Sequence, residues 1–249
     1  MNPSAPAFLT VPVLSHDQCA SDVWRLTVSA ASGGDPGQFY LLRSWDNDPL
    51  LSRPISIHDV GPGTLSFLYQ VRGRGTELLT HLKPGDALTM TGPLGNGFRT
   101  TGLHGRVAVV TGGIGIAPAL HLVRSLAGCE VTVIAGFRHE VYAVSAFALY
   151  GAEVLIATED GCQGTMGFCT DILDPARFDA VLTCGPVPMM ARVAHLCAAA
   201  GVPCQASLEA HMACGVGACL VCACATMSGN KRVCADGPVF DAREVVWDA

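Results

Sequence analysis

The sequence RVAVVTGGIGIAPALHLVRSL, residues 106–126, decides the fold of the middle of this chain. Residues 106–111 form an apolar run, as expected for a strand that is covered on both faces. A glycine-rich turn follows, and a helix is expected over residues 116–126. Further strands are expected over 130–137, 152–157 and 180–184, and an alanine-rich helix over 187–200. Strands that alternate with helices predict a doubly wound parallel sheet, which we assign to residues 103–204.

Residues 1–102 have a different sequence pattern, in which short expected strands are separated by turn residues. Residues 24–28 partly alternate between apolar and polar, as a half-buried strand does. The other strands are expected over 38–43, 54–58, 64–71 and 86–91, with one short helix inside 73–82. Turns such as Gly61-Pro62-Gly63 separate these strands. This spacing predicts a small N-terminal antiparallel β-barrel.

Four cysteines lie close together in the last segment, residues 205–249. They are Cys214, Cys219, Cys222 and Cys234, spaced C-x4-C-x2-C with the fourth further along. Plant-type ferredoxins hold a [2Fe–2S] cluster with this spacing. Glycines in the run allow backbone N–H groups to approach the cluster. The segment therefore predicts a [2Fe–2S] site and a protein that transfers single electrons.

Two alternatives for this segment stay open. Cys224 could replace Cys222 as the third ligand, although the x2 spacing matches the ferredoxin pattern and the x4 spacing does not. The four thiols could also hold a structural zinc ion in a regulatory binding protein, but such sites more usually come as paired C-x2-C knuckles. Seven further cysteines fit no metal spacing and are interpreted as small apolar residues: Cys19, Cys129, Cys162, Cys169, Cys184, Cys197 and Cys204.

Composition narrows the class of protein. The chain has 249 residues, of which 50% are hydrophobic and 14% charged, with a net charge of −6. The acidic balance argues against nucleic acid and against an anionic membrane surface as partners. No apolar run reaches the length of a transmembrane helix, about eighteen residues, and residues 1–14 do not resemble a signal peptide. We therefore expect a soluble, cytoplasmic protein without disulfide bonds.

The glycine-rich turn after residue 111 predicts a dinucleotide site. It reads Gly112-Gly113-Ile114-Gly115-Ile116-Ala117-Pro118 between a strand and a helix, where glycines let the backbone approach a pyrophosphate. Cys184-Gly185-Pro186 ends another strand, and is either close to a nicotinamide or an ordinary turn. Thr158-Glu159-Asp160-Gly161 is either a ligand contact or a polar surface loop. Arg138 could meet a 2′-phosphate, so charge does not decide between NAD and NADP.

Two motifs of the barrel are weak when each is taken alone. Arg53-Pro54-Ile55-Ser56 offers a guanidinium for a phosphate and a hydroxyl for a flavin, although such residues are usually solvated. Gly73-Arg74-Gly75-Thr76 begins the short helix and offers N–H groups, or is a glycine turn capped by Thr76.

The order of these motifs resembles the ferredoxin–NADP reductase superfamily. With the C-terminal cysteines, the chain looks like an electron-transfer subunit of the type B dihydroorotate dehydrogenases. The motifs that carry this narrower resemblance are RPISI (53–57), GPLGNGF (92–98), MACGVGAC (212–219) and CADGPVF (234–240). The resemblance covers nearly the whole chain in the right order, and the C-terminal motif is its most specific part.

The resemblance implies FAD, a [2Fe–2S] cluster and NAD as cofactors, held by residues that match the family motifs. The implied FAD contacts are Arg53, Pro54, Ile55, Ser56, Tyr69, Gln70, Val71, Gly75 and Thr76. The implied NAD contacts are Gly112, Gly113, Gly115, Cys184 and Gly185. The four cysteines at 214, 219, 222 and 234 carry over as cluster ligands, and no residue is implied as catalytic. Relatives often have Tyr at the position of Ile55, a basic residue at Gln70 and Arg at His211, so those three contacts depart from the pattern.

The implied function is an electron relay in pyrimidine (UMP) biosynthesis. Electrons would pass between NAD+ and an FMN-containing dihydroorotate dehydrogenase catalytic subunit, in a heterotetramer with two copies of each chain. This chain would then be the redox subunit of an NAD-dependent enzyme, and orotate would be formed on the other subunit. The alternative is the reductase subunit of an NAD(P)H:ferredoxin oxidoreductase or of a sulfide- or hydrogenase-type complex.

Overall fold

The computed structural model describes residues 6–30 and 33–247. Residues 1–5, which belong to the stretch inspected for a signal peptide, lie outside the described residues, as do 31–32 and 248–249. None of the described helices is long and apolar enough to cross a membrane.

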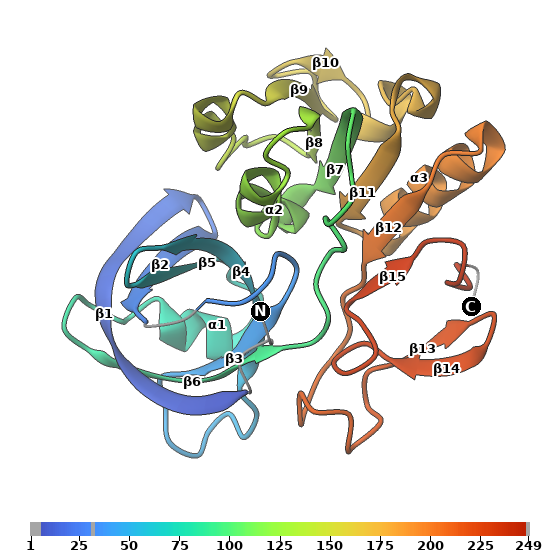
Figure 1. Ribbon diagram of the computed structural model, residues 1–249. Coiled ribbons are helices and arrows are strands. Elements are labelled where there is room, and N and C mark those ends of the chain that lie inside the picture. Colours follow the sequence, from blue (N-terminus) through green and yellow to red (C-terminus); the bar gives the residue numbers. More distant parts are fainter. Residues whose placement is uncertain (1–5, 31–32, 248–249) are drawn as a thin grey trace.

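Six antiparallel strands close the N-terminal barrel, in the order β1-β2-β5-β4-β3-β6 (Figure 1). The predicted barrel is confirmed, and β1 is an additional long strand that the sequence did not predict. The elements of this part are β1 Ala7–Ala20, β2 Val23–Ser29, β3 Phe39–Arg43, β4 Arg53–Gly61, β5 Thr64–Gln70, α1 Arg74–Leu79 and β6 Ala87–Leu94. Alternate side chains of the strands, such as Leu26, Phe67 and Leu88, fill the interior.

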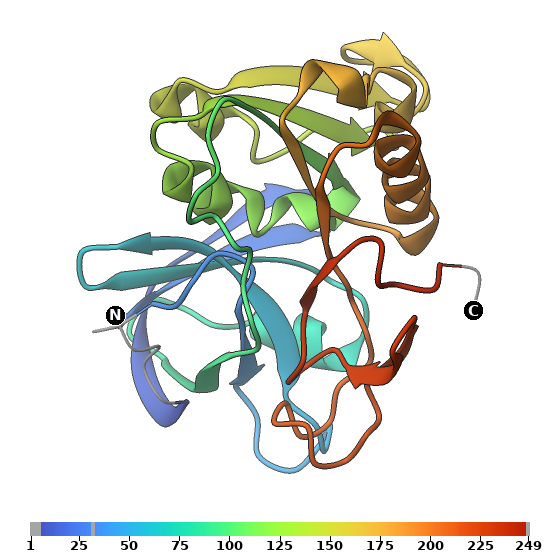
Figure 2. The same cartoon turned by 45° about the vertical axis from the view of Figure 1, so that its right-hand side comes forward.

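The second sheet has seven strands in the order β10-β9-β8-β7-β11-β12-β15, labelled in Figure 1, and Figure 2 shows the molecule turned by 45°. All neighbours are parallel except β15, which pairs antiparallel with β12. The strands are β7 Arg106–Gly112, β8 Glu130–Phe137, β9 Glu153–Thr158, β10 Thr165–Met166, β11 Ala180–Cys184, β12 Cys204–Ser207 and β15 Val239–Asp241. The boundary expected between residues 204 and 205 falls inside β12, so the last segment of the chain contributes to this sheet.

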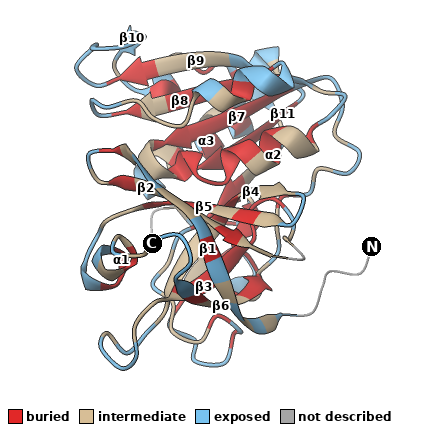
Figure 3. Ribbon diagram, turned by 90° about the vertical axis from the view of Figure 1, so that its left-hand side faces the viewer, coloured by how far each residue is buried: buried red, intermediate tan, exposed pale blue. Residues whose placement is uncertain are grey.

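Helices cover both faces of this sheet. Val107 and Val109 of β7 pack into the cluster that contains α2, whereas Ala108 and Val110 pack into the cluster that contains α3. Strand residues therefore alternate between two buried faces, and Figure 3 shows the buried centre of the sheet. The helices are η1 Gly113–Ile116, α2 Ala119–Ser125, η2 Ser145–Tyr150, η3 Cys169–Asp171, η4 Pro175–Arg177 and α3 Val187–Ala200.

The helix expected over residues 116–126 is shorter than expected and spans Ala119–Ser125. A single 3-10 turn, η1, precedes α2, which begins at Ala119 after Pro118. Pro118 has no N–H to donate to the turn before it, so α2 begins only after this residue.

The C-terminal segment folds back against the barrel. Its hairpin consists of β13 Ala223–Thr226 and β14 Gly229–Arg232. Arg232 donates from Nε to Asp236 at 2.9 Å and holds the turn that contains Cys234. Phe39, Leu41 and Leu94 of the barrel belong to the same buried cluster as Cys222 and Cys234. The cysteine loop is therefore packed directly on barrel strands β3 and β6.

Candidate functional site: paired thiols beside the barrel

The four cysteines of the C-terminal motif lie as two pairs. The Cys219 amide donates to Cys214 Sγ at 3.5 Å, and the Cys234 amide donates to Cys222 Sγ at 3.4 Å. The Gly217 amide donates to Cys234 Sγ at 3.2 Å, so the loop between the first pair also reaches the second pair. All twelve cysteines of the chain lie in the described ranges, and all of them are free thiols.

Backbone N–H groups favour a thiolate at Cys214. Donation from the amides of Cys219 and Val216 lowers the pKa of the Cys214 thiol to about 6. Burial raises the pKa of Cys234 to about 12, and the neighbouring Cys222 sulfur adds to that rise. A cationic group placed between the sulfurs would reverse this rise, because metal ions deprotonate coordinating thiols outright.

Paired thiols suit two iron atoms better than one metal ion. A structural zinc ion needs its four ligands converging tetrahedrally, whereas a [2Fe–2S] cluster takes two thiolates on each iron. Cys222 contacts Cys234, whereas Cys224 is half-buried in β13. The donor set therefore fits a [2Fe–2S] cluster held by the C-x4-C-x2-C arrangement.

One strand separates the cysteine loop from the RPIS motif. Leu41 of β3 pairs with Pro54 of β4, and Leu42 pairs with Arg53. A Cβ placed on Gly215 would lie 2.9 Å from Leu41 Cδ1 and 2.9 Å from Leu94 Cδ1, so the loop lies directly against β3 and β6. Neighbouring strands are about 4.8 Å apart. Only strand β3 and its Leu41 side chain therefore lie between the RPIS motif and the cysteine loop at this point.

Arg53 and the second barrel motif come together. A Cβ on Gly75 would lie 2.3 Å from Arg53 Nε, so the guanidinium lies flat against that glycine. The same group stacks over the Trp45 ring at 5.5 Å, and Nη1 donates to the Leu51 carbonyl. Any residue other than glycine at position 75 would place its Cβ on the guanidinium. The remaining N–H donors of Arg53 suit the phosphates of a flavin dinucleotide.

The other residues expected around the flavin occupy different environments. Pro54, Ile55 and Ser56 are half-buried on β4. Thr76 is buried and its hydroxyl accepts from the Arg72 and Gly73 amides. The N-cap of α1 is Gly73, so Thr76 caps the helix from its third position and is not the N-cap itself. Gln70 donates to Asp22 at 2.6 Å, and Val71 is half-buried after β5.

Tyr69 does not present its side chain at the surface of the barrel. Its ring is 1% exposed, and its hydroxyl is 2.9 Å from Nε2 of His16. His16 Nδ1 faces the Leu82 carbonyl at 2.9 Å and so carries the proton, which makes Nε2 the acceptor for Tyr69. Burial raises the pKa of Tyr69. Any contact of residue 69 with a flavin is therefore restricted to its backbone.

The glycine-rich turn lies against Cys184-Gly185. A Cβ on Gly115 would lie 2.3 Å from the Cys184 carbonyl oxygen and 2.6 Å from Gly185 Cα. A Cβ on Gly112 would lie 2.6 Å from Met189 Sδ, whereas one on Gly113 would meet nothing within 4 Å. The structure thus brings the five residues expected at the nucleotide site to one edge of the sheet, with Gly113 facing open space.

Three further residues at this edge were not singled out from the sequence. The Thr111 hydroxyl is buried and has no hydrogen-bond partner among the described residues, directly before the glycine-rich turn. Burial raises the pKa of Cys184 to about 12, and the Glu209 carboxylate, after β12, raises it further. Met189 lies between Gly112 and Gly185. These three residues follow the carboxyl ends of parallel strands or end one, which is where open α/β sheets bind ligands. That position is the feature of the sequence by which they could have been found.

Acidic residues pair with the cations at the tips of β8 and β9. His139 Nδ1 lies 2.8 Å from Asp160, and Arg138 lies 4.0 Å from Glu159. The His139 side chain lowers the pKa of the Asp160 carboxyl, which keeps it ionised. Arg138, which could have met a 2′-phosphate, therefore has a carboxylate nearby.

Comparisons with known proteins agree with this geometry. Residues 209–246 match the iron-sulfur cluster binding domain of dihydroorotate dehydrogenase B. The electron transfer subunit of dihydroorotate dehydrogenase B (NAD(+)) of Clostridium acetobutylicum is 47% identical over 224 residues, covering 90% of this chain and 91% of that protein. The corresponding protein of Clostridium perfringens is 44% identical, covering 94% of this chain and 96% of that one.

Solved structures give the same picture of the fold. A chain in the structure of NADH-dependent reduced ferredoxin-NADP oxidoreductase superposes with a TM-score of 0.86 at 29% identity, covering 96% of this chain and 90% of that chain. A ferredoxin NADP+ reductase from Neisseria gonorrhoeae superposes with a TM-score of 0.60 at 14% identity, covering 78% and 92%. The barrel, the nucleotide sheet and the paired thiols are thus those of one family, and this chain belongs to the electron transfer subunits of dihydroorotate dehydrogenase B (NAD(+)).

Proposed function

We propose that this chain transfers electrons between NAD+ and a catalytic partner subunit that oxidises dihydroorotate to orotate, in pyrimidine (UMP) biosynthesis. The observation that carries the proposal is the contact between the cysteine loop and β3, the neighbour of the RPIS strand. FAD exchanges two electrons with a nicotinamide and single electrons with an iron–sulfur cluster, so this pair of cofactors connects the two kinds of chemistry.

The chain's own residues hold and separate these cofactors. Arg53 binds the flavin phosphates, with Gly75 leaving room for its guanidinium. Cys214, Cys219, Cys222 and Cys234 would hold the iron atoms of the cluster, and the Gly217 amide donates to Cys234 Sγ. Leu41 and Leu94 fill the space between the barrel and the cysteine loop and exclude water from it.

The nucleotide site favours NAD over NADP. Gly113 allows close approach of the pyrophosphate, and the Thr111 hydroxyl gains a partner when the dinucleotide binds. The carboxylates of Glu159 and Asp160 repel a 2′-phosphate and can accept a ribose 2′-hydroxyl instead.

Exposed apolar side chains around Cys219 suit a partner subunit. Val216, Leu220 and Val221 are 59%, 63% and 57% exposed, and Leu50 of the loop before β4 is 76% exposed. Both loops extend to the same lower end of the molecule in Figures 1 and 2. Leu220 has a φ of 61°, a strained conformation for leucine that points to a functional constraint. We assign this surface to a catalytic subunit that contains FMN, in a heterotetramer with two copies of each chain.

A second function is supported by one comparison. The structural relative at 29% identity is a chain of a NADH-dependent reduced ferredoxin-NADP oxidoreductase, in which the redox partner is different. Identities of 44–47% over most of the chain favour the dihydroorotate dehydrogenase subunits. Purification of the chain together with its native partner separates the two: an FMN-containing subunit that forms orotate supports the first function, and an additional iron–sulfur flavoprotein supports the second.

The test of the cofactor assignment is the visible spectrum of the purified chain and of two cysteine variants. Flavin bands with a broad iron–sulfur shoulder are expected, together with about two irons per chain. Cys222→Ala should lose the cluster and Cys224→Ala should keep it. A colourless protein that contains zinc, or a cluster lost only in Cys224→Ala, would contradict the assignment.

A further inference from the structure

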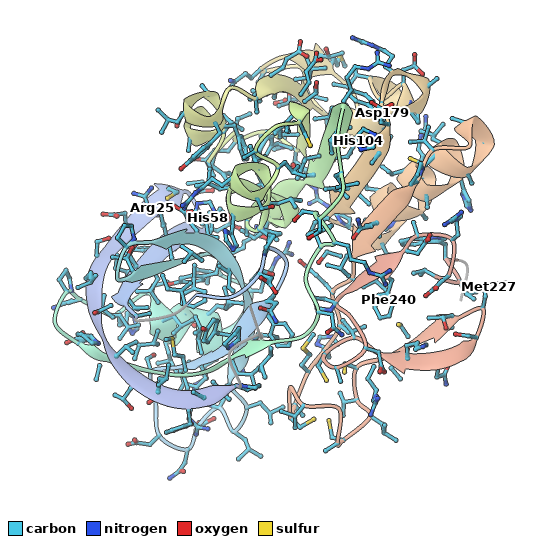
Figure 4. All side chains as sticks on the ribbon, viewed as in Figure 1. Arg25, His58, His104, Asp179, Met227 and Phe240 are labelled. Atoms are coloured by element: carbon cyan, nitrogen blue, oxygen red, sulfur yellow. The ribbon has the colours of Figure 1, made fainter. Side chains whose placement is uncertain are left out.

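A polar cavity of about 230 Å³ lies between the outer face of the barrel and α2. Its lining includes no residue of the glycine-rich turn, of the RPIS motif itself or of the cysteine loop. Figure 4 shows two of its residues, Arg25 and His58, at the end of the barrel that faces the nucleotide sheet. The volume is below the roughly 300 Å³ at which drug-sized pockets begin, so the cavity suits a single small ring and not a nucleotide.

The floor of the cavity is a row of polar residues across four neighbouring strands. Ser15 of β1 pairs with Thr27 of β2, Thr27 pairs with Ser66 of β5, and Ser66 pairs with Asp59 of β4. Thr27 and Ser66 hydroxyls lie 3.0 Å apart. The pairing register shifts next to Ser15 on β1 and next to Asp59 on β4, and such irregularities are frequent beside binding sites.

A carboxylate ends this row, and a cation lies beside it. Arg25 lies two residues from Thr27 along β2, and Asp59 lies two strands away, so their Cα atoms are about 12 Å apart by strand geometry. One nitrogen of Arg25 contacts Asp17 at 3.3 Å, which leaves its other N–H donors free for a second acceptor. Asp59 is held in place by an ion pair with Arg124 of α2. A ligand between them meets a cation at one end and an acceptor at the other.

His58 adds a second acceptor beside Asp59. It is 4% exposed, and Nδ1 lies 2.7 Å from the Ala117 carbonyl, so Nδ1 carries the proton. Burial lowers the pKa of His58 and keeps the ring neutral, which leaves the lone pair of Nε2 as an acceptor. The described residues provide Nε2 with no hydrogen bond, although this side chain lines the cavity. A ligand with an N–H group would supply that missing bond.

The roof of the cavity connects it to the nucleotide site. Leu120 of α2 lines the cavity, and Ala117, whose carbonyl lies 2.7 Å from His58 Nδ1, is the residue before Pro118 in the glycine-rich turn. A ligand in the cavity would therefore hold the barrel against the segment that begins the nucleotide site.

We infer that this cavity binds a small carboxylate whose other end carries N–H donors, the chemical class of dihydroorotate itself. The carboxylate would accept from Arg25, and the ring N–H groups would donate to His58 and Asp59 over the hydroxyl floor. This chain would then sense the substrate of its partner subunit at a site remote from catalysis. The choice of probe rests on the proposed function, whereas the site rests on the cavity alone.

Calorimetric titration of dihydroorotate into the cofactor-loaded full chain, without its partner, tests the inference. Saturable binding at one site is expected, and Arg25→Gln should weaken it about tenfold, because a charge-assisted hydrogen bond is lost. Thr27→Val, which keeps the side-chain volume, should weaken it less. Arg243→Gln removes another exposed arginine, one paired with Asp241, and should change nothing. Slower hydrogen exchange over residues 113–125 in the presence of dihydroorotate is the second expected result.

Three results would overturn the inference: no binding, binding unaffected by both cavity variants, or equal competition by inorganic phosphate, which would indicate a bare anion site. The visible spectrum and flavin reduction by NADH are recorded on the same sample. Loss of those signals would contradict the proposed function, whereas their presence without dihydroorotate binding would contradict the cavity alone.

Discussion

Gly115→Ala tests whether the glycine-rich turn and the Cys184-Gly185 turn form one nucleotide site. The added Cβ would lie 2.3 Å from the Cys184 carbonyl oxygen and 2.6 Å from both Cys184 C and Gly185 Cα. These neighbours are backbone atoms, so no side-chain rotation relieves the contact, and the two turns must separate by about 1 Å. Overpacking of this kind typically costs about 1–3 kcal/mol. We expect a lower free energy of unfolding and NADH affinity reduced about tenfold or more.

Two further glycine variants separate packing from ligand approach. Gly113→Ala has φ 53° and no protein atom within 4 Å of the new Cβ, so it loses stability only through backbone strain of about 1–2 kcal/mol. If the turn binds the pyrophosphate, Gly113→Ala should also lose NADH affinity. Gly102→Ala, with φ 84° and open space, carries similar strain and should keep NADH affinity. NADH titration of flavin fluorescence and urea unfolding provide the measurements. Unchanged NADH affinity in both Gly113→Ala and Gly115→Ala would refute the site.

Three other predictions concern the docking of the partner subunit, the choice between NADH and NADPH, and the pH dependence of stability. Leu220→Gly should raise the free energy of unfolding by about 1 kcal/mol, since glycine relieves the positive φ, yet weaken binding of the partner subunit; retained affinity for the partner would contradict the docking surface. Glu159→Gln combined with Asp160→Asn should lower the KM for NADPH while leaving that for NADH within a few-fold, and an unchanged ratio would remove these residues from specificity. Burial lowers the pKa of His58 and His121, so the unfolded chain takes up more protons below about pH 6.5 and stability should fall as pH drops below that value. The urea midpoint of His121→Gln should depend less on pH, and that of the exposed His104→Gln should follow the wild type.

Regular elements with a strong local pattern could be predicted from the sequence. Strands β8 and β11 and helix α3 occupy the predicted residues, because long apolar runs and an alanine-rich helix leave few alternatives. Strand β1 was missed, since its solvent-facing residues and Pro12 weaken the alternation. Strands β12 and β15 are short, and their pairing joins residues 205–207 to 239–241, which local pattern does not reveal.

The residues of the candidate site likewise include some that a local motif predicts and some that only the folded structure reveals. Cysteine spacing and the glycine-rich turn identified residues whose proximity the structure bears out, because both motifs are local in sequence. Contacts between segments that are distant in the sequence could not be predicted from it. Examples are the contacts of Arg53 with Gly75 and of Gly215 with Leu41. The inward position of the Tyr69 side chain depends on its partner His16 in the unpredicted strand β1, so the sequence did not reveal it.

Electron paramagnetic resonance of the full chain, reduced with NADH under anaerobic conditions, tests the central claim most directly. A reduced [2Fe–2S] cluster with about one unpaired spin per chain is expected, because electrons entering at the nicotinamide reach the paired thiols through the flavin. Cys219→Ala should retain flavin reduction and lose the signal. A wild-type protein whose flavin is bleached by NADH while its iron stays oxidised would contradict the account.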